Sequence, residues 1–367
     1  MVTVRGAGFA GAAPVRSVTF GGRPSPRVQA VSETELKALA PPGSGEADVR
    51  VLAAGGRASP VVPADRYGYD PVPEGPWLGL NGNSSHGLGP IDSFVEKGVL
   101  YDRSGPIEWT SGETLAQAST GLTASLDAGM IPVITIEFPG YEEGACVWGS
   151  DCLPHTEAAV ESYVDGFVGS ATELLHRYPA VPVLLEVINE PWGFGNAEQY
   201  AAILGRLLPA AAAAGLPLDR IYAAADGEGW VRALYRARPQ LQTQVKGWYL
   251  HPYVRTAASG IGALPGIQAE MTSGQNNLIV SEIGFCAADV NGGAAACPST
   301  AAPARTGPEA AADLRRELEA ALPDHRAGWL RALLVYSRND KGWAMQLEGG
   351  ALTPSGSALA GFAEANP

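Results

Sequence analysis

Eight short apolar runs, separated by Ala- and Leu-rich stretches with helical periodicity, follow residue 71 and constrain the fold more than any other feature. This alternation predicts parallel strands joined by crossover helices. The predicted strands span residues 77–80, 98–101, 132–137, 183–189, 221–225, 247–251, 278–282 and 332–337. The clearest helices span residues 114–128, 156–177, 197–214, 229–236 and 308–322. Eight such units within residues 71–367 predict an α/β fold of the (β/α)8 TIM-barrel type.

Residues 1–70 have a different texture, with short β-branched runs that end in turn residues, as in Val18-Thr19-Phe20 before Gly21-Gly22. This spacing predicts a small β-sandwich that precedes the barrel. We therefore expect two domains, residues 1–70 and 71–367. No row of aromatic residues marks a binding surface in the first domain, so a spacer or stabilising role is favoured over sugar binding.

Composition and charge exclude several classes of partner. Of the 367 residues, 46% are apolar, which is enough for real cores, and the net charge is −13. A surface of that sign repels nucleic-acid phosphates and anionic lipids, so we expect neither nucleic acid nor membrane as a partner. The longest apolar stretches, such as residues 130–136, are far shorter than the roughly 20 residues of a membrane span. We expect a monomer.

The four cysteines fall into two close pairs, Cys146 with Cys152 and Cys286 with Cys297. Two short disulfide loops are the simplest interpretation, and they indicate an oxidising compartment. The alternative is a four-thiolate metal site, although these spacings match no zinc pattern well. The predicted disulfides lead us to expect a secreted protein. The first residues alternate like a strand and contain no signal peptide, so we expect that the leader is not part of this chain.

Polar residues stand at the ends of the predicted strands, where the loops of a TIM barrel carry its chemistry. They are Asn81, Arg103, Glu137, Asn189, Glu190, Asp226, His251, Tyr253 and Glu282. Two carboxylates stand out among them. Glu190 follows the fourth predicted strand and Glu282 the seventh, and these strands lie across the barrel mouth from one another. Such a pair can face each other through a substrate, as glycosidic cleavage requires.

The ordered motifs resemble those of clan A glycoside hydrolases such as family 5. The matching segments are Asn-Glu-Pro at 189–191, Ser-Glu-Ile-Gly at 281–284, His-Pro-Tyr at 251–253 and the closing region around 340–358. The resemblance implies a retaining double displacement on a β-linked poly- or oligosaccharide, and an open cleft lined by aromatic residues would make the action endo. In it Glu190 would be the general acid/base, holding its proton near neutral pH, and Glu282 the nucleophile. Neither a cofactor nor a metal is implied.

The same resemblance assigns substrate-binding roles to further residues. Asn189 would bind the sugar 2-hydroxyl, Tyr253 would orient Glu282, and His251 would line the same subsite. Arg103 is the candidate for the arginine that family 5 members place after strand two. Tyr336 and Trp343 compete for the aromatic floor under the reacting sugar. Three further candidates complete the set: Asn81, Glu137 and Trp192. Trp109, Trp148 and Trp192 follow strands in loop-like context and are interpreted as walls of the cleft.

The first 70 residues resemble an IPT/TIG domain, an immunoglobulin-like fold. The resemblance rests on the run at 6–9, the turn at 20–22, the Pro- and Gly-rich corner at 40–45 and the closing segment at 64–69. The chain starts inside that pattern, so the module would lack its first strand and leave a sheet edge unpaired.

Three alternatives remain open at this point. The first is a catalytically inactive barrel that binds glycans, and the second is an exo-acting or transglycosylating member of the same clan. The third is a metal-dependent hydrolase that uses Glu137, Glu190, His251 and Glu282, although paired strand-ending histidines are missing. For Glu137 and Glu228, a role as a structural salt-bridge partner is as plausible as a functional one.

Overall fold

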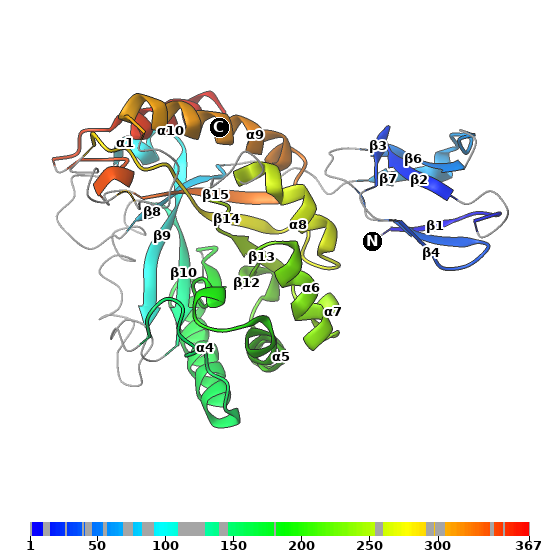
Figure 1. Cartoon of the computed structure of the whole chain (residues 1–367), viewed down its shortest axis with the longest axis horizontal. Helices are drawn as coiled ribbons and strands as arrows, with labels where there is room; N and C mark the ends of the chain where they lie inside the picture. Colours follow the sequence, from blue (N-terminus) through cyan, green and yellow to red (C-terminus); the bar gives the residue numbers. More distant parts are fainter. Residues whose placement is uncertain are drawn as a thin grey trace. The chain divides into compact units, whose positions relative to one another are not determined.

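The fold is known from a computed structural model. It describes residues 2–9, 15–25, 28–38, 40, 46–53, 57–68, 76–82, 92–108, 129–138, 146–179, 181–253, 260–290, 297, 305–337, 341–347 and 349–366. The chain divides into two compact units, Met1–Glu74 with Leu322–Leu330, and Gly75–Ala321 with Arg331–Pro367. The second unit contains a closed barrel of eight parallel strands and the first contains two small antiparallel sheets, which confirms the predicted fold class (Figure 1).

All eight predicted barrel strands form, in the order β10-β11-β12-β13-β14-β15-β8-β9 around the barrel. Their bounds are β8 Leu78–Gly82, β9 Val99–Glu108, β10 Ile131–Glu137, β11 Leu184–Val187, β12 Ile221–Ala224, β13 Gly247–Leu250, β14 Leu278–Ile283 and β15 Leu330–Tyr336. Strands buried on both faces read as continuous apolar runs, and β11, β12, β13 and β14 are buried at every residue. Gly79 on β8 allows the close packing, because a Cβ there would collide with Tyr101 and Leu334.

Helices connect the strands and lie outside the barrel (Figure 1). They are α1 Asp92–Val95, α4 Glu157–Arg177, α5 Ala197–Ala213, α6 Glu228–Ala237, α7 Leu241–Gln244, α8 Leu264–Glu270, α9 Gly307–Arg326 and α10 Pro354–Ala365. Four predicted helices are thus confirmed as α4, α5, α6 and α9, whereas the helix predicted at 114–128 lies outside the described residues. Helix α5 begins with a capping box, in which Asn196 and Gln199 each satisfy a backbone N–H of the other.

The first unit is a sandwich of two sheets. Strands β1 Val2–Arg5, β5 Glu35–Ala38 and β4 Val28–Ala30 form one sheet, and β3 Arg23–Pro24, β2 Val15–Phe20, β6 Glu46–Ala53 and β7 Arg66–Gly68 form the other. Their facing side chains share one core, listed here: Phe9, Val18, Phe20, Leu36, Ala38 and Val49. Strand β1 is an edge strand, with β5 as its partner among the described residues. A cavity of about 790 Å³ is lined by residues of β1, β6 and β7 and contains no pair of carboxylates.

Both predicted cysteine pairs form disulfides, Cys146 with Cys152 and Cys286 with Cys297. The four-thiolate metal site considered from the sequence is therefore wrong, because each thiolate it would need is bonded to another sulfur. Within the described part of the chain, no helix combines the length and the apolar character needed to cross a membrane.

Candidate active site

The ends of β11 and β14 bring Glu190 and Glu282 to one place at the barrel mouth. A carboxylate oxygen of each, together with a ring nitrogen of His251, lies within 4.8 Å of the others. Glu282 is 9% exposed, and the Glu190 side chain is 20% exposed. Two acidic side chains at this separation, partly open to solvent, can contact the same small group between them.

The turn after β11 aims Glu190 through an uncommon backbone. Ile188 has a φ of 60° and Glu190 a φ of 46°, both in the left-handed region that non-glycine residues rarely adopt. Buried hydrogen bonds hold this turn: Tyr249 Oη donates to the Ile188 carbonyl and accepts from the Glu190 N–H at 3.1 Å. The Glu137 carboxylate accepts from the Asn189 N–H at 2.7 Å. Strain held by such contacts is typical of functional sites.

Glu282 is kept ionised by its neighbours. Arg103 Nη1 donates to Oε1 at 2.5 Å, and Tyr253 Oη donates to Oε2 at 2.7 Å. Burial by itself would raise the pKa of Glu282, but the positive charges of His251 and Arg103 and the hydrogen bonds from Tyr253 and Asn81 lower it below the ordinary value of 4.5. A depressed pKa makes this carboxylate a charged nucleophile or ligand over a wide pH range.

Arg103 on β9 contacts a carboxylate on each of two other strands, Glu186 on β11 and Glu282 on β14. Its Nε donates to Glu186 at 2.7 Å, and its Nη2 donates to Thr135 Oγ1 and Asn189 Oδ1 at 2.9 Å each. Burial opposes the charge of the guanidinium, but attraction to Glu186 and Glu282 outweighs that cost, so the pKa of Arg103 is raised. The planar donor fork of arginine suits such a divided set of acceptors.

His251 at the end of β13 joins the two carboxylates. Its Nδ1 lies 2.8 Å from Glu190 Oε1 and 3.7 Å from Glu282 Oε2, and its Nε2 lies 3.1 Å from Ser281 Oγ. Burial alone would lower the pKa of His251, but the charge of Glu282 and the hydrogen bond to Glu190 raise it above 6.5. The imidazole therefore favours the protonated form beside the charged Glu282.

Aromatic rings surround the carboxylates on two sides. Tyr253, Tyr336 and Trp343 form a cluster with edge-on ring contacts and centroid separations of 5.8–6.5 Å. Gly284 makes this cluster possible beside β14, since a Cβ there would collide with the Tyr336 carbonyl. On the other side, Trp192 lies edge-on to His251, with a centroid separation of 6.1 Å.

The structure brings most of the sequence candidates together in one cluster, but it gives several of them buried positions. Asp226 and Trp148 are not among the cluster contacts given above for the described part of the chain, and Trp109 lies outside the described residues. Asn81, Arg103 and Glu137 are 4%, 2% and 2% exposed, so their contacts in the structure are with other protein groups rather than with solvent. Glu228, weighed as a possible functional residue, forms an exposed ion pair with Arg232 on α6.

Four residues of the cluster were missed by sequence reasoning: Thr135, Glu186, Tyr249 and Ser281. Each lies inside an apolar strand and is fully or almost fully buried. A charged residue in the middle of an apolar run, such as Glu186 in Leu-Leu-Glu-Val, was a usable signal, because a buried carboxylate needs a partner.

Comparisons with known proteins reveal similarity in structure only. No protein-family profile and no curated protein sequence matches the chain. Among solved structures, a family 39 glycoside hydrolase from the gut symbiont Bacteroides cellulosilyticus is similar, with a TM-score of 0.53, 16% identity, and coverage of 91% of this chain and 73% of the other. A GH39 β-xylosidase from Caulobacter crescentus has a TM-score of 0.55 at 15% identity, covering 79% of this chain and 71% of its own.

A third similar structure is the catalytic domain of a mannanase from a Streptomyces species, with a TM-score of 0.51, 16% identity, and coverage of 85% of this chain and 87% of the other. At such low identity the likeness concerns the fold. The comparison therefore supports the eight-stranded barrel fold of this chain.

Proposed function

We propose that this protein is a retaining glycoside hydrolase of the clan A type that cleaves β-linked poly- or oligosaccharides. The observation that carries the proposal is the pair of carboxylates, Glu190 and Glu282, with oxygens within 4.8 Å of each other across the barrel mouth. Retaining enzymes keep their two carboxyl groups about 5–5.5 Å apart, whereas inverting enzymes need about 6.5–9.5 Å to admit a water molecule. The barrel fold shared with a β-xylosidase and a mannanase supports the same conclusion.

In the first step, Glu282 attacks the anomeric carbon while the glycosidic C–O bond breaks and Glu190 gives its proton to the leaving oxygen. Glu282 suits this part because Arg103 and Tyr253 keep it ionised and fix both its oxygens. A covalent glycosyl ester on Glu282 results, and its formation removes the negative charge beside Glu190.

In the second step, Glu190 takes a proton from water, the resulting hydroxide attacks the anomeric carbon, and Glu282 leaves. His251 contacts Glu190 through its Nδ1, and its positive charge stabilises the ionised Glu282 that attacks in the first step and leaves in the second. Asn189 accepts from Arg103 through Oδ1, which orients its amide N–H₂ group as the donor for the sugar 2-hydroxyl. Tyr336 and Trp343 supply the aromatic floor for the reacting ring.

The proposal is tested with β-glucans, mannans, xylans and aryl β-glycosides, following the anomer of the product by NMR. Retention of the anomeric configuration is expected. Glu282→Gln and Glu190→Gln should each lose most turnover. With an activated aryl glycoside and azide, Glu190→Ala should form the β-glycosyl azide and Glu282→Ala the α-glycosyl azide, because azide replaces a different group in each case. Inversion by the unaltered enzyme would contradict the assignment.

The cluster of Glu190, His251 and Glu282 also has a geometry that could hold a metal ion, so a metal-dependent hydrolase is the second candidate. Activity that survives dialysis against a strong chelator would exclude it. An inactive glycan-binding barrel is the third: in that case the unaltered protein would bind the polysaccharides of the panel without cleaving any.

The finer assignments complete the proposal. The first unit is proposed to be an IPT/TIG-like module spanning residues 1–70, and its sandwich with an edge strand at β1 supports this. Secretion is supported by the two disulfides, which persist in oxidising compartments, and a monomeric state is part of the proposal. Endo action remains part of the proposal and is tested by the size of the first products from a long polysaccharide.

A further inference from the structure

The loop between β10 and α4 presents an exposed tryptophan. Trp148 is 59% exposed and its neighbour Val147 is 62% exposed. The remaining large hydrophobic side chains with such exposure in the described residues are valines of the first unit: Val31, Val61 and Val62. Tryptophan is strongly buried on average, so a ring left largely in water at the end of the barrel where the site lies calls for an explanation.

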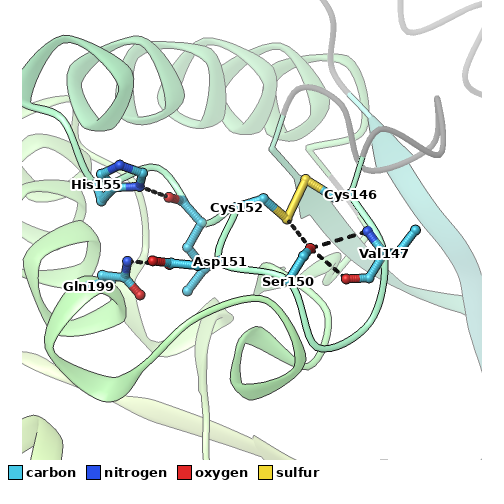
Figure 2. The surroundings of a disulfide bond; sticks show 8 residues. Cys146, Val147, Ser150, Asp151, Cys152, His155 and Gln199 are labelled. Carbon is cyan, nitrogen blue, oxygen red and sulfur yellow. Dashed lines mark hydrogen bonds between the residues drawn. A yellow bond between two sulfur atoms is a disulfide. The ribbon is translucent and has the colours of Figure 1, made fainter.

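The loop that carries Trp148 is fixed in place by covalent and hydrogen bonds (Figure 2). Cys146 and Cys152 close it with a disulfide. Ser150 Oγ donates to the Val147 carbonyl at 2.6 Å and lies 3.3 Å from the Val147 N–H. Asp151 accepts from Gln199 in the first turn of α5 at 2.6 Å. Because these bonds hold the loop, presenting the ring costs little ordering entropy when a ligand binds.

The indole ring lies against the turn that follows Glu190. A Cβ added to Gly193 would collide with three atoms of the Trp148 ring, so glycine at this position lets the ring pack on the backbone. Phe194 meets the same ring edge-on, with a centroid separation of 5.7 Å. The backbone N–H of Gly149 also donates to the Gly193 carbonyl at 2.7 Å. One side of the ring is thus supported by protein, and the rest remains exposed.

That turn connects the ring directly to the candidate acid/base. The 3-10 helix η2, Pro191–Gly193, has Glu190 as its N-cap residue, and the Gly193 N–H donates to the Glu190 carbonyl at 2.8 Å. The ring therefore packs on the backbone one short turn after Glu190, and it is not among the contacts that form the cluster of the two carboxylates.

We propose that Trp148 is a platform for a pyranose ring of the bound glycan. This ring lies beyond the two rings that the cleaved bond joins. The apolar C–H face of a pyranose matches a rigid aromatic face. The inference rests on the proposed function for its ligand class. It adds a residue that determines chain-length preference rather than the chemistry.

The test compares Trp148→Ala and Trp148→Phe with Val147→Ala as the matched control from the same loop. The substrates are 4-nitrophenyl β-glycosides of glucose, mannose and xylose, and the corresponding β-1,4-oligosaccharides. We expect Trp148→Ala to raise KM about tenfold or more for long oligosaccharides, while kcat and KM for the aryl monoglycoside stay within twofold of the unaltered enzyme. Trp148→Phe should recover most of the affinity, and Val147→Ala should change little.

Two results would overturn the platform. One is an unchanged KM for every chain length in Trp148→Ala. The other is an equal loss of kcat on the aryl monoglycoside, which would mean that the ring merely supports the turn of Glu190. Binding of the same oligosaccharides to Glu282→Gln, with and without Trp148→Ala, separates the two proposals. If the unaltered protein binds longer oligosaccharides more tightly but does not cleave them, hydrolysis is refuted and the platform proposal stands. If it binds none of the oligosaccharides, the platform proposal is refuted.

Discussion

Arg103 and Glu186 form an ion pair of 2.7 Å inside the barrel, with 2% and 0% of their side chains exposed. The guanidinium is shared with Glu282, so one buried cation serves a structural carboxylate and the candidate nucleophile at once. Removing one partner of such a network leaves an uncompensated charge in a medium of low polarity.

Arg103→Ala should therefore be strongly destabilising, because it removes the buried cation that Glu186 and Glu282 share. We expect the free energy of unfolding to fall by about 3–5 kcal/mol, measured by urea denaturation at neutral pH. Arg206→Ala is the control, since the ion pair of Arg206 with Glu157 on the protein surface is solvent-exposed and should contribute little. Equal stability of Arg103→Ala and the unaltered protein would contradict the role of the network.

Stability should fall as the pH rises through the neutral range, because of His251. Its pKa in the folded state is raised above 6.5, so the folded protein binds a proton that the unfolded chain releases. The stabilisation is complete below the unfolded value and is lost as the pH passes the folded pKa. Urea midpoints measured from about pH 6 to pH 9 should show this decline, and His251→Asn should flatten it. An identical decline in that variant would assign it to other groups.

Tyr253→Phe should shift the acid limb of the activity profile. The hydrogen bond from Tyr253 helps to hold the pKa of Glu282 below 4.5, so its loss moves the limb to higher pH. A hydrogen bond to a charged group contributes about 1.5–3 kcal/mol, which predicts a loss of about 10- to 100-fold in kcat/KM. Tyr222→Phe removes another buried hydroxyl, which bonds Asn277, and should leave the limb in place. A limb that stays unmoved in Tyr253→Phe would count against this account.

Glu190→Gly should be more stable than Glu190→Ala. The left-handed φ of 46° at this residue costs alanine roughly 1–2 kcal/mol and costs glycine almost nothing. Glycine loses part of this advantage through its greater freedom in the unfolded chain, so we expect a net difference of about 1 kcal/mol in urea unfolding. Both variants lack the carboxyl group and should lose most turnover of unactivated glycans. The reverse order of stability would mean that the turn relaxes when the glutamate is removed.

The barrel could be predicted from the sequence because its strands are short, apolar and buried on both faces, so each run stands out against the helices between them. The pair Glu190 and Glu282 could be predicted in the same way, since each directly follows such a run. The helix of residues 156–177 was found within one residue of its observed start, where Thr156 caps the N-terminus.

The supporting network could not be predicted, because it depends on which residues of different strands reach the same height in the barrel. Glu186 and Thr135 come within reach of Arg103 only through the register that pairs β9, β10 and β11. The strained turn at Ile188 was also hidden, because the sequence there continues an apolar run and gives no glycine to signal a left-handed residue.

The sharing of Arg103 between a structural and a reactive carboxylate has a practical consequence for anyone who redesigns this pocket. Directed evolution that randomises the layer around this arginine would discard most clones as misfolded before specificity could be selected. Diversity is better introduced in the loop closed by Cys146 and Cys152, because the residues between them make none of the contacts that Arg103 forms within the described residues.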